Sequence, residues 1–350
     1  MNYVNLIKAG FSTILRTDRA LNRPVHLQIE PTTNCNLKCK FCNRAKIIKT
    51  PKQLKFDEFR NVFDQILPSK VSISGRGEPL LADDLCKMIF YAKSHGSSAT
   101  ITTNFTLGAI RAEELIDSGI DDIRISIETA NAEVYRRIRG ADLHGKVLSG
   151  ISKINEIKRK IQRNLPRIGF EVVITKDSIS ECPGIISLAR EYGVERVNFR
   201  VLDIMGVEEK KDDLLFNLSQ EEFVGLLNKI KELEVSSGVK TNVGELVDNI
   251  SFVCGVYQGK VNCVPDCIYP WLQVYVNIDG EIAPCCALNT DESVSMGNIF
   301  ARKFAEVWNA DGYLKLRKNA REKKLPFKSC RRCPSKGLKW FVNKYKFFKL

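Results

Sequence analysis

Residues 30–42 read Glu30-Pro31-Thr32-Thr33-Asn34-Cys35-Asn36-Leu37-Lys38-Cys39-Lys40-Phe41-Cys42, which places three thiols in a C-x3-C-x2-C run. The apolar segment before it, 25–29, is typical of a strand, so we expect the thiols on the loop at its carboxyl end. Soft thiolates at such short spacing suit zinc or an iron-sulfur cluster. Because zinc usually takes four ligands and the run contains no histidine, the three cysteines indicate a 4Fe–4S cluster with one iron open to a small molecule.

The same run resembles the CxxxCxφC signature of the radical S-adenosylmethionine (SAM) superfamily, in which φ is aromatic, and Phe41 stands at the aromatic position. The resemblance implies that Cys35, Cys39 and Cys42 hold the cluster and that SAM chelates its open iron. An electron from the cluster would break the sulfonium bond and give a 5'-deoxyadenosyl radical, while the protein supplies orientation and excludes water. A plain zinc loop is the alternative.

Six short runs rich in Ile, Val and Thr follow one another, with helical patterns between them. They predict strands over Val25–Glu30, Lys70–Ser74, Ala99–Thr103, Asp122–Glu128, Ile168–Thr175 and Arg196–Leu202. The helices are predicted over Gln53–Leu67, Asp83–Ser94, Arg111–Asp117, Gly145–Gln162 and Ser180–Tyr192. Parallel neighbouring strands must be joined by crossover segments, and the predicted helices can serve as these. We therefore expect an α/β fold with a parallel sheet. Six units match the partial (β/α)6 barrel of the radical SAM family, whose reactive groups gather at the carboxyl ends of the strands.

The second strand ends in Ser74-Gly75-Arg76-Gly77-Glu78-Pro79, which is similar to the GGEP motif of the family with Arg76 inserted. In the family this segment holds the amino group of SAM. Gly75 and Gly77 permit a close approach of the main chain, and Glu78 is an acceptor suited to an ammonium group.

Two later strand ends add candidates for SAM binding. Asn104 follows the third strand, and Ser126 ends the fourth in a Ser-Ile-Glu sequence similar to the family's Ser-x-Asp, which makes Ser126 a candidate for the SAM ribose or carboxylate. An arginine in the following segment resembles the family's clamp on the SAM carboxylate, a task that suits a planar guanidinium. Arg136, Arg137 and Arg139 compete for this role, and we favour Arg136.

A second cysteine set lies near the C-terminus. The Asp279-Gly280 dipeptide predicts a hairpin with cysteines on both sides, and a C-x2-C pair follows the helical stretch 301–323. The pattern resembles the start of a SPASM extension, shortened to the "twitch" form. This resemblance implies one auxiliary 4Fe–4S cluster held by Cys267, Cys285, Cys330 and Cys333. Cys286 could replace Cys285 as the ligand. A zinc site made of four cysteines is the alternative to the auxiliary cluster.

The amino-acid composition limits the class of protein to which this chain can belong. The 350-residue chain is 44% hydrophobic, which allows a sizeable core, and its 12 cysteines favour metal ligands in a reducing compartment. We find no signal peptide and no apolar run long enough to span a membrane, so we expect a cytoplasmic protein.

The net charge of +13 resides in residues 301–350, which hold sixteen Lys or Arg and three Asp or Glu. The aromatic and lysine-rich tail is expected to be a solvated helix or to contact an anionic surface.

Five segments are expected. They are an amphipathic helix over 1–24, a radical SAM barrel over 25–218, a bridge over 219–262, an auxiliary-cluster domain over 263–335 and a basic tail over 336–350. The first helix has an apolar stripe that we expect to pack on the barrel rather than on lipid: Val4, Ile7, Phe11, Ile14 and Leu15. In the bridge, Ser219 and Glu222 predict a capping box, and Gly238 a helix end.

The main functional hypothesis is hydrogen abstraction from a substrate carbon, with the auxiliary cluster taking the second electron and a net oxidation of a small molecule such as a sugar alcohol. Peptide modification of the maturase type is one alternative, and a non-catalytic iron-sulfur or zinc protein that binds polyanions through its tail is another. The family resemblance also implies an external electron donor of the flavodoxin or ferredoxin type. Histidine-based hydrolysis is not expected, because His26, His95 and His144 lie at no predicted strand end with a partner.

Overall fold

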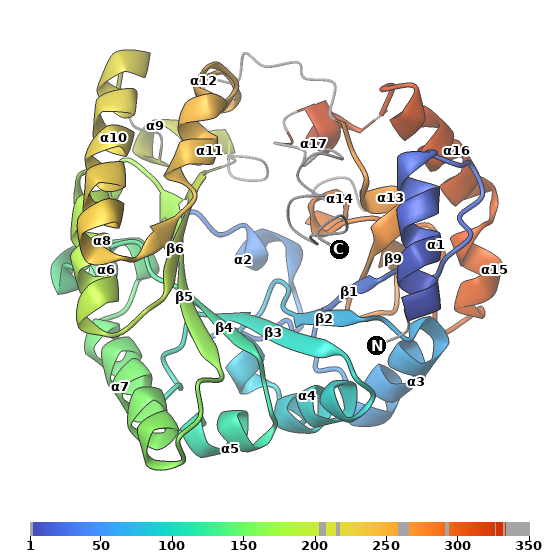
Figure 1. Ribbon diagram of the computed structural model, residues 1–350, viewed down its shortest axis with the longest axis horizontal. Coiled ribbons are helices and arrows are strands. Elements are labelled where there is room, and N and C mark those ends of the chain that lie inside the picture. The colour runs from blue at the N-terminus through green and yellow to red at the C-terminus, as the bar shows by residue number, and fades with distance from the viewer. Residues whose placement is uncertain are drawn as a thin grey trace.

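The computed structural model describes residues 3–202, 208–214, 218–257, 266–290, 294–325, 327–331 and 333. One nine-stranded sheet runs through the described chain in the order β7-β6-β5-β4-β3-β2-β1-β8-β9. The strands are β1 (His26–Ile29), β2 (Lys70–Ile73), β3 (Ser98–Thr103), β4 (Asp122–Ser126), β5 (Arg167–Ile174), β6 (Arg196–Val201), β7 (Lys240–Thr241), β8 (Gln273–Val276) and β9 (Ile282–Ala283). Figure 1 shows the sheet curving without closing into a full barrel.

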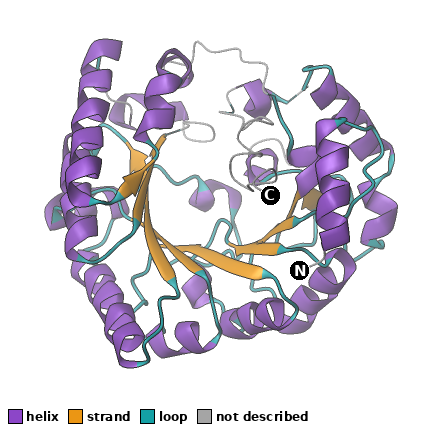
Figure 2. Ribbon diagram, in the orientation of Figure 1, coloured by secondary structure: helices purple, strands orange, loops and turns teal. Residues whose placement is uncertain are grey.

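Helices cover the convex side of this sheet, as Figure 2 shows. The barrel helices are α3 (Phe56–Ile66), α4 (Leu85–Ser94), α5 (Ala112–Asp117), α6 (Ala132–Arg139), α7 (His144–Lys160) and α8 (Cys182–Glu191). Short helix α2 (Arg44–Ile47) lies instead within the curve of the sheet (Figure 1). The later helices are α9 (Lys211–Leu214), α10 (Gln220–Ser237), α11 (Val243–Asp248), α12 (Ile250–Tyr257), α13 (Tyr269–Leu272), α14 (Cys286–Thr290), α15 (Phe304–Trp308), α16 (Asp311–Arg321) and α17 (Lys328–Arg331).

The six predicted strands and their parallel pairing are confirmed. Strands β1 to β6 pair in sequence order and in parallel. Alternate residues of the strands are fully buried against the helices, such as Leu27 and Ile29 of β1. The intervening side chains are half-buried and face the concave side, as expected for a pleated strand.

The sheet continues beyond the predicted barrel at both ends. The expected bridge contributes β7, which pairs in parallel with β6, and α10, whose predicted capping box at Ser219 and left-handed end at Gly238 are both present. At the other end β8 pairs in parallel with β1, with Ile29 opposite Val276. The predicted hairpin at Gly280 is confirmed as the antiparallel pair β8–β9. The auxiliary segment therefore extends the barrel sheet and is not a separate layer.

The predicted orientation of the first helix, with its apolar stripe against the barrel, was wrong. Helix α1 (Tyr3–Ile14) buries small and polar residues, including Ala9 and Ser12, and leaves its apolar stripe in solvent. Its inner side lies against α13. Among the described residues, no helix is both long and apolar enough to cross a membrane. The basic tail 336–350 and Cys263 lie outside the described residues.

Candidate active site

The three thiols of the first cysteine run lie on the loop that leaves the carboxyl end of β1. Two hydrogen bonds hold this loop against the rest of the barrel: Lys40 N donates to Ile138 O at 2.9 Å, and Thr33 N donates to Lys52 O at 3.0 Å. Cys42 N donates to Cys39 O at 3.1 Å and closes a tight turn between two of the thiols. The loop therefore has a fixed path, and all three sulfurs stand where reactive groups of parallel barrels gather.

Each of these sulfurs has an N–H donor in range. Arg139 Nη1 lies 3.5 Å from Cys39 Sγ, the main-chain N of Arg44 lies 3.4 Å from Cys42 Sγ, and Asn104 Nδ2 lies 4.0 Å from Cys35 Sγ. Hydrogen bonds to the sulfurs are one of the means by which proteins stabilise and tune iron-sulfur clusters. Burial raises the pKa of Cys35 and Cys39, and the charge of Cys42 raises both further. Three neighbouring thiols with a donor at each sulfur fit a cluster, whose positive irons would offset this unfavourable burial of thiolates.

The two glycines of the 75–78 turn allow it to press against the cysteine loop. A Cβ at Gly77 would lie 2.3 Å from Thr32 O and 2.5 Å from Asn34 O, and one at Gly75 would lie 2.5 Å from Cγ of Glu30. Glu30 is buried, and its carboxylate accepts from Arg76 N at 2.6 Å. The close approach predicted for these glycines is therefore made to the chain that carries the thiols.

Glu78 is buried in the turn after β2 and accepts hydrogen bonds from the protein itself. It is 2% exposed, and its carboxylate accepts from Thr103 Oγ1, from Leu80 N at 3.0 Å and from Asn104 N at 2.6 Å. Three protein donors therefore already bond this carboxylate, and its contact with the SAM ammonium group stays a prediction. Burial raises the pKa of Glu78, and these hydrogen bonds oppose the rise. Glu78 ties the end of β3 to the turn after β2, and so positions Asn104.

Asn104 lies close to the cysteine loop, as predicted from its place at a strand end. Its Nδ2 donates to Asn36 Oδ1 at 2.9 Å, and its Oδ1 accepts from Thr106 N at 3.0 Å. Both ends of the amide are therefore engaged. Phe41 belongs to the same loop; its ring is half-buried, and the guanidinium carbon of Arg139 lies 5.6 Å from the ring centre. Ser126 ends β4 on the concave side, opposite Glu171 of β5.

Of the three competing arginines, Arg139 has its side chain buried beside the cysteine loop, whereas Arg136 is exposed, and which of them binds the SAM carboxylate stays a prediction. The side chain of Arg136 is 57% exposed and pairs with Glu133, and that of Arg137 pairs with Asp177 at 3.2 Å. Arg139 is buried and forms a bidentate pair with Glu128, with Nε 2.6 Å from Oε2. Burial lowers the pKa of Arg139 and the charge of Glu128 raises it, and the net effect is a rise.

The periodicity of α6 would have identified Arg139. Tyr135 and Ile138 are buried on one side of this helix, and Arg139 falls one turn after Tyr135, on the same side. Arg136 lies on the exposed side, with Glu133 one turn before it. Glu128, the last residue of the Ser-Ile-Glu motif, supplies the buried countercharge, a role that the sequence did not indicate.

Cys267 lies within electrostatic range of the other three cysteines predicted for the auxiliary cluster. Burial raises the pKa of Cys267 well above its ordinary value, and the charges of Cys285, Cys333 and Cys330 add to the rise. The pKa of Cys285 is raised to about 12, again chiefly by burial. Within the described residues no three His, Cys, Asp or Glu side chains converge closely enough to hold a single metal ion. A cubane cluster binds each of its four thiolates through a different iron.

Cys286 is exposed and lies within range of side chains from β1 and β6. Its thiol is hydrogen-bonded by Gln28 of β1 and feels the charge of Arg200 of β6. Other polar side chains on the concave side of the sheet bond one another across the strands: Glu171 accepts from Asn198 Nδ2 at 2.6 Å and from Arg200 Nε at 3.0 Å. The concave side is thus polar and charged, and it is shared by both ends of the sheet.

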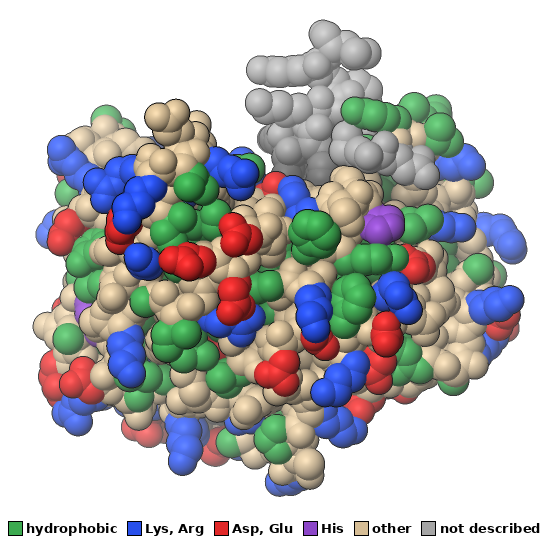
Figure 3. All heavy atoms as spheres, turned by 90° about the horizontal axis from the view of Figure 1, so that it is seen from below, with side chains coloured by type: hydrophobic (Ala, Val, Ile, Leu, Met, Phe, Trp, Pro, Cys, Tyr) green, Lys and Arg blue, Asp and Glu red, His purple; other side chains and the backbone are tan. Residues whose placement is uncertain are grey.

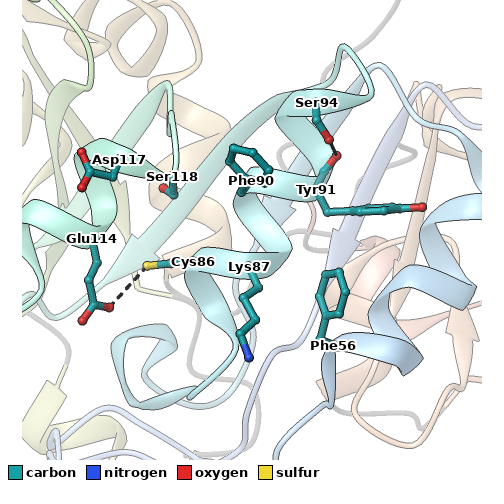
Figure 4. Close-up of a pocket in the computed structure, with 9 residues that line it drawn as sticks. All are labelled: Phe56, Cys86, Lys87, Phe90, Tyr91, Ser94, Glu114, Asp117 and Ser118. Carbon is teal, nitrogen blue, oxygen red and sulfur yellow. Dashed lines mark hydrogen bonds between the residues drawn. The ribbon is translucent and has the colours of Figure 1, made fainter.

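A separate hollow lies on the outside of the barrel, between α4 and α5 (Figure 4). Phe56, Phe90 and Tyr91 give it an apolar lining, and Cys86 Sγ lies 3.8 Å from Glu114 Oε2. Its side chains come from the covering helices and not from the carboxyl ends of the strands, so we do not assign it to the site.

Comparisons with known proteins agree with this geometry. The family model of the radical SAM superfamily matches residues 29–189, and that of the SPASM iron-sulfur cluster-binding domain matches residues 267–334. The PqqA peptide cyclase of Xanthomonas campestris pv. campestris is 24% identical over 326 residues, which cover 91% of this chain and 81% of that protein.

Two solved structures share the fold. Streptococcus suis SuiB bound to precursor peptide SuiA superposes with a TM-score of 0.67 at 16% identity, covering 97% of this chain and 77% of that one. The structure of histidine-tagged anSMEcpe with bound AdoMet gives a TM-score of 0.63 at 19% identity, covering 92% of this chain and 95% of that one.

Proposed function

Because the chain is a radical SAM superfamily enzyme with a C-terminal SPASM domain, we propose that it modifies a peptide substrate. The SAM-binding 4Fe–4S cluster, the auxiliary iron-sulfur site and SAM supply the radical chemistry. The proposal differs from the sugar-alcohol oxidation expected first from the sequence. The similarity to a protein named a peptide cyclase extends through both domains, and this supports the peptide alternative.

The observation that carries the proposal is the pairing of β1 with β8. Strand β1 leads into the loop of Cys35, Cys39 and Cys42, and the hairpin that begins with β8 leads to Cys285. One continuous sheet thus connects the segments that carry the two thiol sets, which supports the proposal that a single bound substrate reaches both.

The concave side also suits a peptide chemically. Amide groups taken out of water require hydrogen-bond partners. Side chains along the strands supply both hydrogen-bond donors and acceptors: Arg200, Asn198, Glu171 and Gln28. We assign these side chains to substrate binding and orientation, and we assign Asn104 and Arg139 to positioning of the cysteine loop through their contacts with Asn36 and Cys39.

Anaerobic turnover with labelled substrates tests the proposal. Reconstituted protein is incubated with SAM, dithionite and either a perdeuterated peptide library or a perdeuterated polyol mixture. We expect deuterium in 5'-deoxyadenosine from the peptide arm only, with a peptide product that has lost two hydrogens. A Cys39→Ala variant is the matched control and should give neither product. Deuterium transfer from the polyol arm alone would overturn the proposal and restore the small-molecule oxidation.

A further inference from the structure

Helix α1 presents its apolar side to solvent and its small, polar side to the protein. Six large apolar side chains, 46–69% exposed, form what we call the α1 stripe: Tyr3, Val4, Ile7, Phe11, Ile14 and Leu15. The inner side holds Asn5, Ala9, Gly10, Ser12 and Thr13. A surface helix normally turns its apolar side inward, so this arrangement is reversed. A contiguous exposed apolar surface of this kind marks an interaction site.

Hydrogen bonds on the inner side fix this orientation. Asn5 Oδ1 accepts from Arg23 N at 2.8 Å, and Asn5 Nδ2 donates to Arg23 O at 3.1 Å. Ser12 Oγ accepts from Leu21 N at 2.9 Å. A rotation that buried the α1 stripe would break all three bonds and bury apolar side chains where Asn5 and Ser12 now lie. The exposure of the stripe is therefore a property of the fold.

The α1 stripe lies in a basic setting. Residues 3–17 contain Lys8 and Arg16 but no Asp or Glu, and Arg16 pairs with Asp266. The next acid, Asp18, pairs with Arg321 of α16 at 2.8 Å, which places α16 beside α1 (Figure 1). Further cations are exposed on α16 and just after it: Lys315, Lys318, Lys323 and Lys324. Two exposed acids, Asp311 and Glu322, belong to the same segment, and Glu322 pairs with Lys324, so the lysines outnumber the acids there. In contrast, acidic and basic side chains alternate on the face formed by the outer barrel helices (Figure 3).

We propose that the α1 stripe lies in the interface of an anionic lipid bilayer. Helices that lie in the plane of a membrane combine an apolar side at the acyl boundary with cations at the headgroups. A second copy of this chain would bring two basic flanks together, and the lysine-rich segment 336–350 would do the same, so repulsion disfavours both as occupants. A nucleic acid would contact the cations but leave the α1 stripe in water.

Vesicle sedimentation with the full chain tests the proposal. Large unilamellar vesicles of phosphatidylcholine with one quarter phosphatidylglycerol are compared with vesicles of phosphatidylcholine alone. We expect binding to the anionic vesicles, at least tenfold weaker binding by the Ile7→Ser/Phe11→Ser variant, and weaker binding by Lys315→Glu/Lys318→Glu. The matched control is Phe90→Ser/Ile110→Ser, which removes two apolar side chains, 62% and 77% exposed, in α4 and in the turn before α5. It should bind as the wild type does.

Thermal unfolding monitored by circular dichroism shows whether the variants fold, and we expect unchanged midpoints because the altered side chains are exposed. The proposal is overturned if the wild type does not sediment with anionic vesicles, if it binds both vesicle types equally, or if Ile7→Ser/Phe11→Ser binds like the wild type. A wild-type dimer that this variant converts to a monomer would also overturn it, because the occupant would then be a second copy.

Discussion

Arg139 and Glu128 form a bidentate ion pair that is buried directly beside the thiol of Cys39. The pair joins α6 to the segment after β4, and the third guanidinium nitrogen reaches the cysteine loop. A guanidinium offers five donors in a rigid fork, so one side chain can serve a carboxylate and a sulfur together. We therefore regard Arg139 as a positioning residue for the loop.

Replacing Arg139 by Met should destabilise the protein by about 3–5 kcal/mol, because Glu128 would be left as a buried charge without its partner. Urea unfolding of the reconstituted protein measures this loss. Iron content per chain should fall as well, since Cys39 loses its N–H donor. The matched control is Arg136→Met, on the exposed side of the same helix, for which we expect a change within about 0.5 kcal/mol.

The double variant Arg139→Met/Glu128→Leu separates the two effects. Removing both charges should restore much of the stability, because apolar replacements of a buried pair are often neutral. It should not restore iron content, which depends on the contact with Cys39. Equal stability of Arg139→Met and the wild type would contradict our interpretation of the pair.

Gly77 is predicted to be essential for the path of the cysteine loop. In a Gly77→Ala variant the new Cβ meets the main-chain oxygens of Thr32 and Asn34, and backbone atoms cannot swing away as a side chain can. We expect a loss of about 1–3 kcal/mol in the free energy of unfolding and reduced iron incorporation. Gly225→Ala in α10 is the control, because nothing lies within 4 Å of its added Cβ, and it should stabilise by about 1 kcal/mol. Full iron incorporation in Gly77→Ala would contradict the assignment.

Local patterns in the sequence predicted the barrel well and its surroundings less well. The strands β1 to β6 and the helix caps depend on residues close in the chain, such as Ser219 with Glu222. The pairing of β1 with β8 joins segments far apart in the chain, and no periodicity specifies it. The orientation of α1 likewise depends on Asn5 meeting Arg23, a contact that competes with the apolar pattern and prevails.

In the candidate site too, the sequence predicted the features set by local patterns and not those set by contacts between distant residues. The cysteine spacing alone identified the thiol loop, and strand ends identified Asn104. Choosing among the three arginines required the buried side of α6, and the packing role of Gly77 required the neighbouring loop. Chemistry carried by one short stretch is therefore readable from the sequence, whereas the contacts that position it are not.

Lys70 should make stability depend on pH. Burial, together with the charge of Arg124, lowers the pKa of Lys70 from 10.5 to about 8. The unfolded chain thus binds more protons between these values, so the free energy of unfolding should rise with pH from about 8 toward 10.5. Below pH 8 the native state carries the full penalty. We expect Lys70→Met to stabilise the protein at pH 7 by about 2 kcal/mol, after allowing for solvent screening of a half-buried group.

Urea midpoints of the wild type and Lys70→Met at pH 7.5 and pH 10 measure this effect. Cysteines and tyrosines also titrate in this range, so the difference between the two proteins is the relevant quantity. It should shrink as pH rises. A constant difference would mean that Lys70 keeps its ordinary pKa in the native state.

The auxiliary site should distinguish Cys285 from Cys286, although the two are neighbours in the chain. The charges of Cys286 and Cys333 raise the pKa of Cys285, and the charge of Cys285 in turn raises that of Cys267. Cys286 instead meets Gln28 on the concave side. We expect Cys285→Ser to lose about four of about eight irons per chain, since a cluster with one thiolate missing is weakly held. Cys286→Ser should keep them all, and Cys42→Ser should lose the other four. Iron and sulfide analysis with electron paramagnetic resonance of the reduced proteins measures this, and a loss in Cys286→Ser with none in Cys285→Ser would reverse the ligand assignment.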